Sequence, residues 1–267
     1  MFGNITVGQY LPGNSVIHRL DPRIKIVIAV LFIVAIFLVV DVFGYLVAGL
    51  FGVMAVLLSG IQPRVIIRGL RPVIFILALT VVLHLFMNQG RPIFSIGPLV
   101  ATWEGFRLGL FMGTRIVFLI LFTSLLTLTT SPVALTDGLE RLLKPFQRIG
   151  LPAHELAMMM TIALRFIPTL LEEAEKIMKA QMARGADFQS GNLFARAKSL
   201  VPLLVPLFVS AFRRADELAT AMEARCYRGG KGRTRMKQLV AAPRDIAALF
   251  LTVSLVGVMI YLRHRAG

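Results

Sequence analysis

Long, nearly uncharged apolar segments constrain this chain more than any other feature of its sequence. Several come close to the length of about 20 residues that a helix needs to cross a lipid bilayer. Backbone N–H and C=O groups inside a bilayer must find partners within the protein, and a helix satisfies them within one segment. The five strongest segments are residues 24–40, 42–58, 72–87, 105–128 and 246–262. We therefore predict an all-α membrane protein with about five transmembrane helices.

The connections between these segments carry their own signals. Asp41 falls between the first two segments and predicts a tight turn there. Residues 62–71 carry three arginines and are expected to form a cytoplasmic loop, because short loops on that side of a membrane are rich in basic residues. Residues 88–103 contain two glycines and two prolines, which predicts a structured external loop or a short hairpin.

The composition supports several bilayer spans, with 57% hydrophobic residues and a mean hydropathy of +0.77. The net charge of +15 could indicate a nucleic-acid partner, but the basic residues gather in particular segments. Residues 131–244 hold 18 of the 29 lysines and arginines. This pattern is typical of membrane topology signals, and no RNA-binding pattern of aromatic and basic residues is present. We therefore expect no nucleic-acid partner.

The same charge bias predicts the organisation of the chain. Residues 1–130 are expected to form a membrane region with four spans, residues 131–243 a cytoplasmic region with long helices, and residues 244–267 the last transmembrane helix. The first 23 residues are mixed in polarity and lack the apolar core of a cleavable signal peptide. With a cytoplasmic N-terminus, five spans place the C-terminus outside, although residues 263–265 are basic.

Two shorter apolar runs lie within the basic region, at residues 156–171 and 200–212. A charge and a proline interrupt the first, and two prolines interrupt the second. Runs of this kind are more often buried or interfacial helices than bilayer spans. We predict two long helices whose apolar N-terminal parts touch the membrane layer and whose C-terminal halves are amphipathic.

The ends of these two helices are alike. Residues 174–185 align without a gap to residues 215–226, and each copy places one arginine at the end of an alanine-rich helix. The identical pairs are Ala174/Ala215, Ala180/Ala221, Ala183/Ala224 and Arg184/Arg225. A single arginine there could simply complement the helix dipole. Two within matching flanks indicate a partner that offers the same socket twice, and a planar guanidinium suits a carboxylate socket.

Nothing in the sequence indicates catalysis by this chain. The phosphate-binding pattern Gly-x-x-x-x-Gly-Lys-Ser/Thr is absent, so ATP-driven work is expected of another subunit. The four histidines are scattered and Cys226 is the one cysteine, so we expect no metal site, no disulfide and no cofactor. His84 and Arg115 are the main candidates for active-site residues inside the predicted spans. Two isolated side chains are few for an active site within a membrane.

Several short motifs occur in a characteristic order around the five predicted spans. They are residues 9–15 (QYLPGNS), 18–25 (HRLDPRIK), 126–132 (LTLTTSP) and 163–168 (ALRFIP), followed by the two ends Ala183-Arg184-Gly185 and Ala224-Arg225-Cys226. In this order the chain resembles the transmembrane (T) component of energy-coupling factor transporters, the ATP-driven importers of vitamins and metal ions. The resemblance runs almost from end to end.

This resemblance implies partners and roles. Two ABC-type ATPase subunits would each receive one coupling-helix end, and by position the docking residues are Ala183, Arg184, Gly185, Ala224, Arg225 and Cys226. Cys226 departs from the commoner glycine; we expect it to keep the role of the arginine and to alter how the helix ends. A separate small membrane protein, the substrate-binding (S) subunit, would pack on the coupling helices. Its candidate contacts here are Met158, Met159, Met160, Phe208 and Phe212.

The resemblance also implies a non-catalytic subunit in the plasma membrane of a prokaryote, with its coupling region in the cytoplasm. Three alternatives stay open. The nearest is a T component dedicated to cobalt or nickel import, which the sequence does not separate from a vitamin importer. A self-sufficient permease or channel would need a polar path through the spans, which offer few polar residues. An integral membrane enzyme would have to rely on His84 and Arg115.

Overall fold

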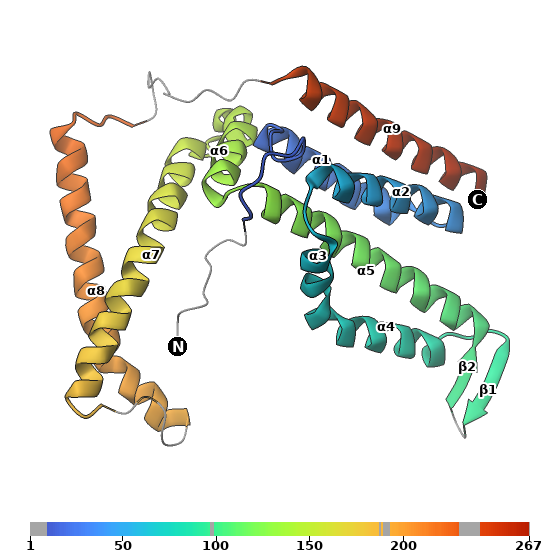
Figure 1. The fold of residues 1–267 in the computed structure, drawn as a ribbon, viewed down its shortest axis with the longest axis horizontal. Coiled ribbons are helices and arrows are strands. Elements are labelled where there is room, and N and C mark those ends of the chain that lie inside the picture. The colour runs from blue at the N-terminus through green and yellow to red at the C-terminus, as the bar shows by residue number, and fades with distance from the viewer. Residues whose placement is uncertain (1–9, 97–98, 187, 189–192, 230–240, 267) are drawn as a thin grey trace. The chain divides into compact units, whose positions relative to one another are not determined.

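The computed structural model describes residues 10–96, 99–186, 188, 193–229 and 241–266, and it is helical over most of them (Figure 1). The elements are α1 (Pro22–Leu38), α2 (Val42–Ser59), α3 (Pro63–Leu70), a 3-10 turn η1 (Arg71–Val73), α4 (Ile74–Met87), β1 (Pro92–Ile96), β2 (Leu99–Thr102), α5 (Trp103–Thr129), α6 (Pro132–Leu143), a second 3-10 segment η2 (Lys144–Ile149), α7 (Ala153–Ala183), α8 (Leu193–Ala224) and α9 (Pro243–Ala266).

Contacts divide the chain into two compact units. The bundle unit comprises Gly8–Leu139 and Gln238–Gly267, and it contains α1 to α5 and α9. The helix-pair unit contains Glu140–Lys237, and its long elements are α7 and α8. The assignment of residues 1–130, 131–243 and 244–267 to membrane and cytoplasm stays a prediction.

The predicted all-α membrane fold is confirmed. Among the described residues, five helical segments are long and apolar enough to cross a membrane: α2, Pro63–Met87, α5, α7 and α9. This set differs from the sequence prediction at two places. The first predicted span, α1, is 17 residues long and is not among these five segments. α7 is among them, although its sequence predicts a helix outside the bilayer.

The connections follow the prediction at one place and depart from it at another. β1 and β2 pair as an antiparallel hairpin, which is one of the two alternatives predicted for residues 88–103. The predicted loop at residues 62–71 is wrong, because α3 occupies most of it. Pro63 favours a helix start at its first position, and Ile66 is buried in a cluster with residues of α5. Burial of one apolar side of α3 therefore orders a segment whose arginines alone suggested a loop.

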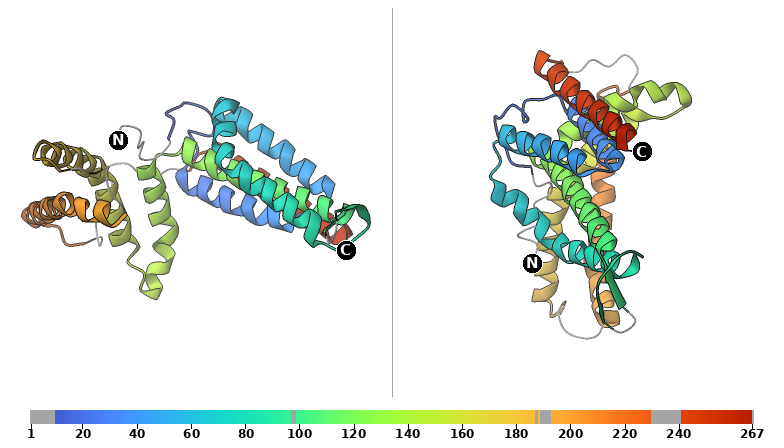
Figure 2. Two further views of the ribbon diagram at one scale, coloured as in Figure 1. Left: turned by 90° about the horizontal axis from the view of Figure 1, so that it is seen from below. Right: turned by 90° about the vertical axis from the view of Figure 1, so that its right-hand side faces the viewer.

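The core of the bundle unit is built from α1, α2, α5 and α9. Phe32 of α1 is fully buried and stacks on Phe51 of α2 and Phe122 of α5. Leu255 and Met259 of α9 join the same cluster. α9 packs on α1, and Figure 2 shows this bundle from two further sides. Four helices separated along the sequence thus share one apolar core.

α4 and α5 approach each other closely through glycines. At Gly105 an added Cβ would lie 2.3 Å from the carbonyl oxygen of His84. At Gly109 it would lie 3.0 Å from the Cα of Val81. Small residues at such spacing let the backbones of membrane helices come into contact, which gains packing where no hydrophobic effect drives association. Glycine is therefore required at Gly105 by the neighbouring helix.

Matched glycine-to-alanine substitutions test this packing. We expect Gly105→Ala to lower the free energy of unfolding by about 2 kcal/mol or more, because its new methyl group overlaps a backbone oxygen. Gly257 in α9 has open space around it, so Gly257→Ala should be neutral or stabilise by roughly 0.5–1 kcal/mol through helix propensity. Thermal unfolding of the two variants in detergent measures the difference. Equal melting temperatures would contradict the close approach of α4 and α5.

Candidate functional site

The two long helices of the helix-pair unit run in opposite directions and cross each other (Figure 1). Glu173 of α7 forms an ion pair with Arg214 of α8 at 2.8 Å, and its carboxylate also accepts a hydrogen bond from the hydroxyl of Ser210. Further toward the end of α7, the side chain of Gln181 donates to the carbonyl of Pro202 at 3.4 Å. Later residues of α7 therefore contact earlier residues of α8, as in an antiparallel pair. These polar contacts fix the register of the two helices.

This register decides where the two arginines lie. Arg184 follows Glu173 by about three helical turns on α7, and Arg225 follows Arg214 by the same interval on α8. Because the helices run in opposite directions, the two arginines lie at opposite ends of the pair. At 1.5 Å per residue their separation is roughly 30 Å. A single small socket could therefore not hold both arginines at once.

The end of α7 is closed by two backbone hydrogen bonds. Gly185 N donates to Met182 O at 3.0 Å, and Ala186 N donates to Gln181 O at 3.0 Å. This pairing is a Schellman motif, in which the residue after the C-cap takes a left-handed conformation. Gly185 has φ +87°, so it ends the helix as the sequence predicts. Arg184 is the exposed C-cap residue directly before it.

The end of α8 is closed in the same way. Cys226 N donates to Glu223 O at 2.8 Å, and Tyr227 N donates to Met222 O at 3.0 Å. Cys226 takes φ +57°, and among the described residues other than glycine it alone has a positive φ. The expectation that Cys226 alters the helix end is therefore wrong. The two backbone hydrogen bonds hold Cys226 in a left-handed conformation that residues with a Cβ disfavour. Arg225 therefore occupies the same C-cap position at the end of α8 as Arg184 does at the end of α7.

The predicted docking residues are accessible. Both arginines and their neighbours on either side are exposed, which leaves the guanidinium groups free to approach a partner. These exposed residues are Ala183, Arg184, Gly185, Ala224, Arg225 and Cys226. Their role in docking stays a prediction.

The left-handed position gives a stability prediction. An L side chain there costs about 1 kcal/mol relative to glycine, because its Cβ crowds the following carbonyl. We therefore expect Gly185→Ala to destabilise the protein by about 1 kcal/mol and Cys226→Gly to stabilise it by a similar amount. Thermal unfolding in detergent checks both variants. Ala180→Gly within α7 is the control and should destabilise, since glycine lowers helix propensity. Destabilisation by Cys226→Gly would contradict a shared helix ending.

The candidate contacts for a membrane partner do not form one patch. Met159 and Met160 are exposed and Met158 is half-buried, all near the start of α7. Phe208 and Phe212 of α8 are 61% and 70% exposed. They lie beside the part of α7 around Glu173, which is about four helical turns beyond the methionines. The two phenylalanines instead belong to a longer exposed apolar stripe on α8. It also contains Leu200, Val201, Leu204, Val205 and Val209.

A buried polar network in the bundle unit was missed by the sequence analysis. Lys25 of α1 is 5% exposed, and its Nζ donates to His18 O at 3.2 Å, Thr129 O at 2.9 Å and Thr130 Oγ1 at 3.1 Å. The network joins two of the characteristic motifs, residues 18–25 and 126–132. The position of Lys25 at the start of the apolar segment 24–40 could have predicted such a network, because a buried charge needs several polar partners.

A second part of this network holds the start of α9. Asp245 is 1% exposed, and its carboxylate accepts from the backbone N–H groups of Asp21 at 2.9 Å and Ala242 at 2.7 Å. The second contact caps α9, because the N-cap N–H has no partner within the helix. The first ties the start of α9 to the start of α1. The sequence alone does not indicate this pairing, since the partners lie far apart along the chain.

The two polar residues considered for an enzyme do not meet in an active site. Arg115 donates to the carbonyl of Val39 at 3.2 Å and lies over the ring of Phe37. His84 contacts Asn88 in the next turn of its own helix at 3.0 Å. Arg115 therefore provides a donor for the backbone carbonyl of the buried C-cap residue of α1, which is a structural role.

Comparison with known proteins gives a consistent family. The family model of the cobalt transport protein CbiQ matches residues 13–236. A protein of Thermosediminibacter oceani is 64% identical over 248 residues, covering 93% of this chain and 94% of its own. Proteins of Clostridium kluyveri and Bacillus subtilis are 56% and 49% identical, covering 98% of this chain and 98% and 100% of their own. All three are energy-coupling factor transporter transmembrane proteins, EcfT.

Identity of this extent over nearly the whole length shows that the chain is a component of a transporter. The apolar helices agree with a multi-pass membrane protein. The paired arginine ends and the motifs joined by Lys25 lie within the matched residues. This chain therefore belongs to the family of energy-coupling factor transporter transmembrane (T) components.

Proposed function

We propose that this chain couples two ATPase subunits to a separate substrate-binding membrane subunit in an ATP-driven importer. One observation carries the proposal. α7 and α8 end in the same backbone motif, each presents an exposed arginine, and their antiparallel packing places these arginines at opposite ends. Two equivalent sockets on two ATPase subunits fit this arrangement. ATP hydrolysis would occur on those partners, and this chain would be non-catalytic.

The proposal requires both arginines on the cytoplasmic side. An antiparallel pair that crossed the bilayer would place them on opposite sides, so we propose that α7 and α8 lie along the membrane surface. The ion pair between Glu173 and Arg214 supports this orientation, because charged side chains inside a bilayer are costly. The length and apolar composition of α7 also suit a helix with one face against the membrane.

Coupling would proceed by a change in the positions of α7 and α8 relative to each other. ATP binding would close the ATPase dimer and move its two sockets relative to each other. Each socket would carry one arginine, and the contacts of Glu173 with Arg214 and Ser210 would transmit the change between α7 and α8. The membrane-facing surface of the pair would then reorient the substrate-binding subunit.

The exposed stripe on α8 is the best-supported contact for that subunit. Its side chains, including Phe208 and Phe212, form a continuous apolar surface, and large exposed apolar patches mark interaction sites. Met158, Met159 and Met160 would form a second contact at the start of α7, where flexible methionines can adapt to a partner. We place the assembly in the plasma membrane of a prokaryote.

The transported compound is proposed to be a vitamin or another micronutrient, recognised by the partner subunit. The family model is named for cobalt transport, so a dedicated cobalt or nickel importer is the second candidate.

Affinity purification from native membranes in mild detergent tests the function. We expect two ATPase chains, or two copies of one, together with a small membrane protein. Identification of the small protein by mass would name the substrate and separate a vitamin importer from a cobalt or nickel importer. Recovery of the chain alone, with transport activity in liposomes, would instead indicate a self-sufficient permease.

A further inference from the structure

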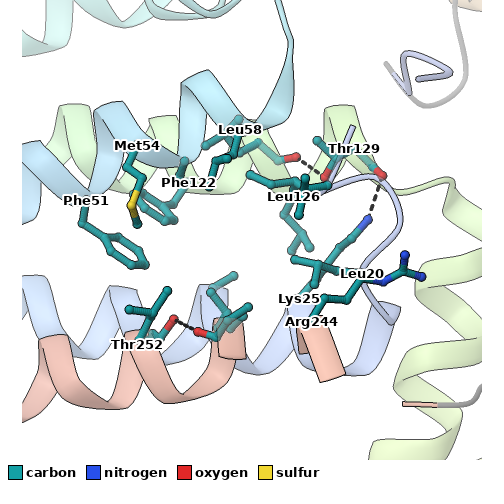
Figure 3. A pocket seen from close by; sticks show the side chains of 18 of the residues that line it. Leu20, Lys25, Phe51, Met54, Leu58, Phe122, Leu126, Thr129, Arg244 and Thr252 are labelled. Carbon is teal, nitrogen blue, oxygen red and sulfur yellow. Dashed lines mark hydrogen bonds between the residues drawn. The ribbon is translucent and has the colours of Figure 1, made fainter. Parts of the chain in front are cut away.

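The bundle unit contains an apolar cavity of about 270 Å³ among α1, α2, α5 and α9 (Figure 3). Phe51 and Met54 of α2 and Phe122 of α5 form much of its wall. Ala247 and Ala248 of α9 also line it, and their small side chains leave the space that larger residues would fill. The proposed docking of ATPases at α7 and α8 makes no use of this cavity.

The cavity reaches the outer surface of the bundle between α2 and α9. Three of its lining residues, Met54, Leu58 and Leu251, are 38%, 45% and 52% exposed. Both α2 and α9 are long and apolar enough to cross a membrane, and in a bilayer their exposed sides would face lipid hydrocarbon. A groove with apolar walls that opens at this place is accessible to an acyl chain.

One end of the cavity carries a cation. Arg244 at the start of α9 lines the cavity and is exposed, and no salt bridge involves it within the described part of the chain. Lys25 also lines the cavity, but its Nζ already donates to three oxygen atoms, of His18, Thr129 and Thr130. Arg244 is therefore the cation available to a negatively charged group outside the protein.

We propose that this cavity binds one acyl chain of an anionic phospholipid whose headgroup phosphate contacts Arg244. Charge complementarity identifies the occupant, since a basic group beside an apolar groove between transmembrane helices matches the two ends of such a lipid. The bound chain would fill the space left by Ala247 and Ala248 and would contact both α2 and α9. The proposal rests on the membrane location of the bundle unit and is independent of ATPase docking.

Native mass spectrometry of the full-length chain in mild detergent tests the site. We expect one molecule of phosphatidylglycerol to be retained and phosphatidylcholine with the same acyl chains to be lost. Arg244→Gln should weaken phosphatidylglycerol binding by about fivefold, the effect of about one basic side chain at an anionic lipid. Ala248→Phe should abolish retention because its ring occupies the cavity.

Matched controls lie on the same helix. Gly257→Phe adds a ring where α9 has open space, and Arg263→Gln removes a cation at the other end of α9; neither should change retention. Equal retention of both lipids, or unchanged binding by Arg244→Gln, would overturn the proposal even if Ala248→Phe failed to fold. Loss of the lipid whenever the substrate-binding subunit co-purifies would also overturn it and assign the groove to that partner.

Discussion

Replacement of both Arg184 and Arg225 by alanine is expected to reduce ATP-dependent uptake to background. Truncating one partner of a hydrogen-bonded charge pair at an interface costs about 2–5 kcal/mol, which weakens each contact by about 30-fold or more. Because the two arginines lie at opposite ends of the helix pair, each single variant should also impair uptake. Co-purification of the ATPase subunits measures the loss of docking. Uptake of the compound that the co-purified membrane subunit binds measures the loss of transport.

The matched control for this experiment is Arg213→Ala. Arg213 is an exposed arginine of α8 that lies far from either helix end, so its loss should leave ATPase binding and uptake near wild type. Arg184→Lys and Arg225→Lys keep the charge and remove the planar fork, and they should restore binding only in part. Wild-type uptake in the double alanine variant would refute the proposed coupling role.

Replacement of Asp245 by alanine is expected to cause the largest loss of stability in the bundle unit. The change removes a buried carboxylate and leaves the N–H groups of Asp21 and Ala242 without their acceptor. An unsatisfied buried polar group costs about 1–3 kcal/mol, so we expect a loss of about 3 kcal/mol. Thermal unfolding of the purified chain in detergent measures it.

Asp41→Ala provides the comparison for Asp245→Ala. Asp41 also lies at the start of a helix, α2, but its side chain makes no capping hydrogen bond there. Its replacement should therefore change stability by no more than about 0.5 kcal/mol. An equal effect of the two substitutions would mean that the carboxylate of Asp245 does not connect α1 with α9.

The elements that the sequence could predict are those with a local cause. Apolar runs of sufficient length identified the helices of the bundle, and Gly185 identified the end of α7, because both depend on neighbouring residues. The glycines and prolines of residues 88–103 indicated a structured loop or a hairpin, and the pairing of β1 with β2 is the second of these. α3 was missed because the apolar contacts of Ile66 lie on another helix.

The candidate site divides in the same way. The repeat of residues 174–185 at 215–226 is sufficient to identify two equivalent helix ends, and hence two arginines with one role. That Cys226 would adopt the left-handed conformation of Gly185 could not be read from its residue type, since L side chains disfavour it. Two backbone hydrogen bonds decide that conformation.

Hydropathy and repetition along the chain are sufficient to predict the helical membrane fold and the two equivalent arginine ends, because both are visible in the order of the residues. The separation of these ends by roughly 30 Å comes from the packing of the two helices, since it depends on the antiparallel register that the ion pair of Glu173 with Arg214 fixes. The tertiary structure also decided that Lys25 and Asp245 are buried, because their partners are distant in sequence and meet only when α1, α5 and α9 pack together.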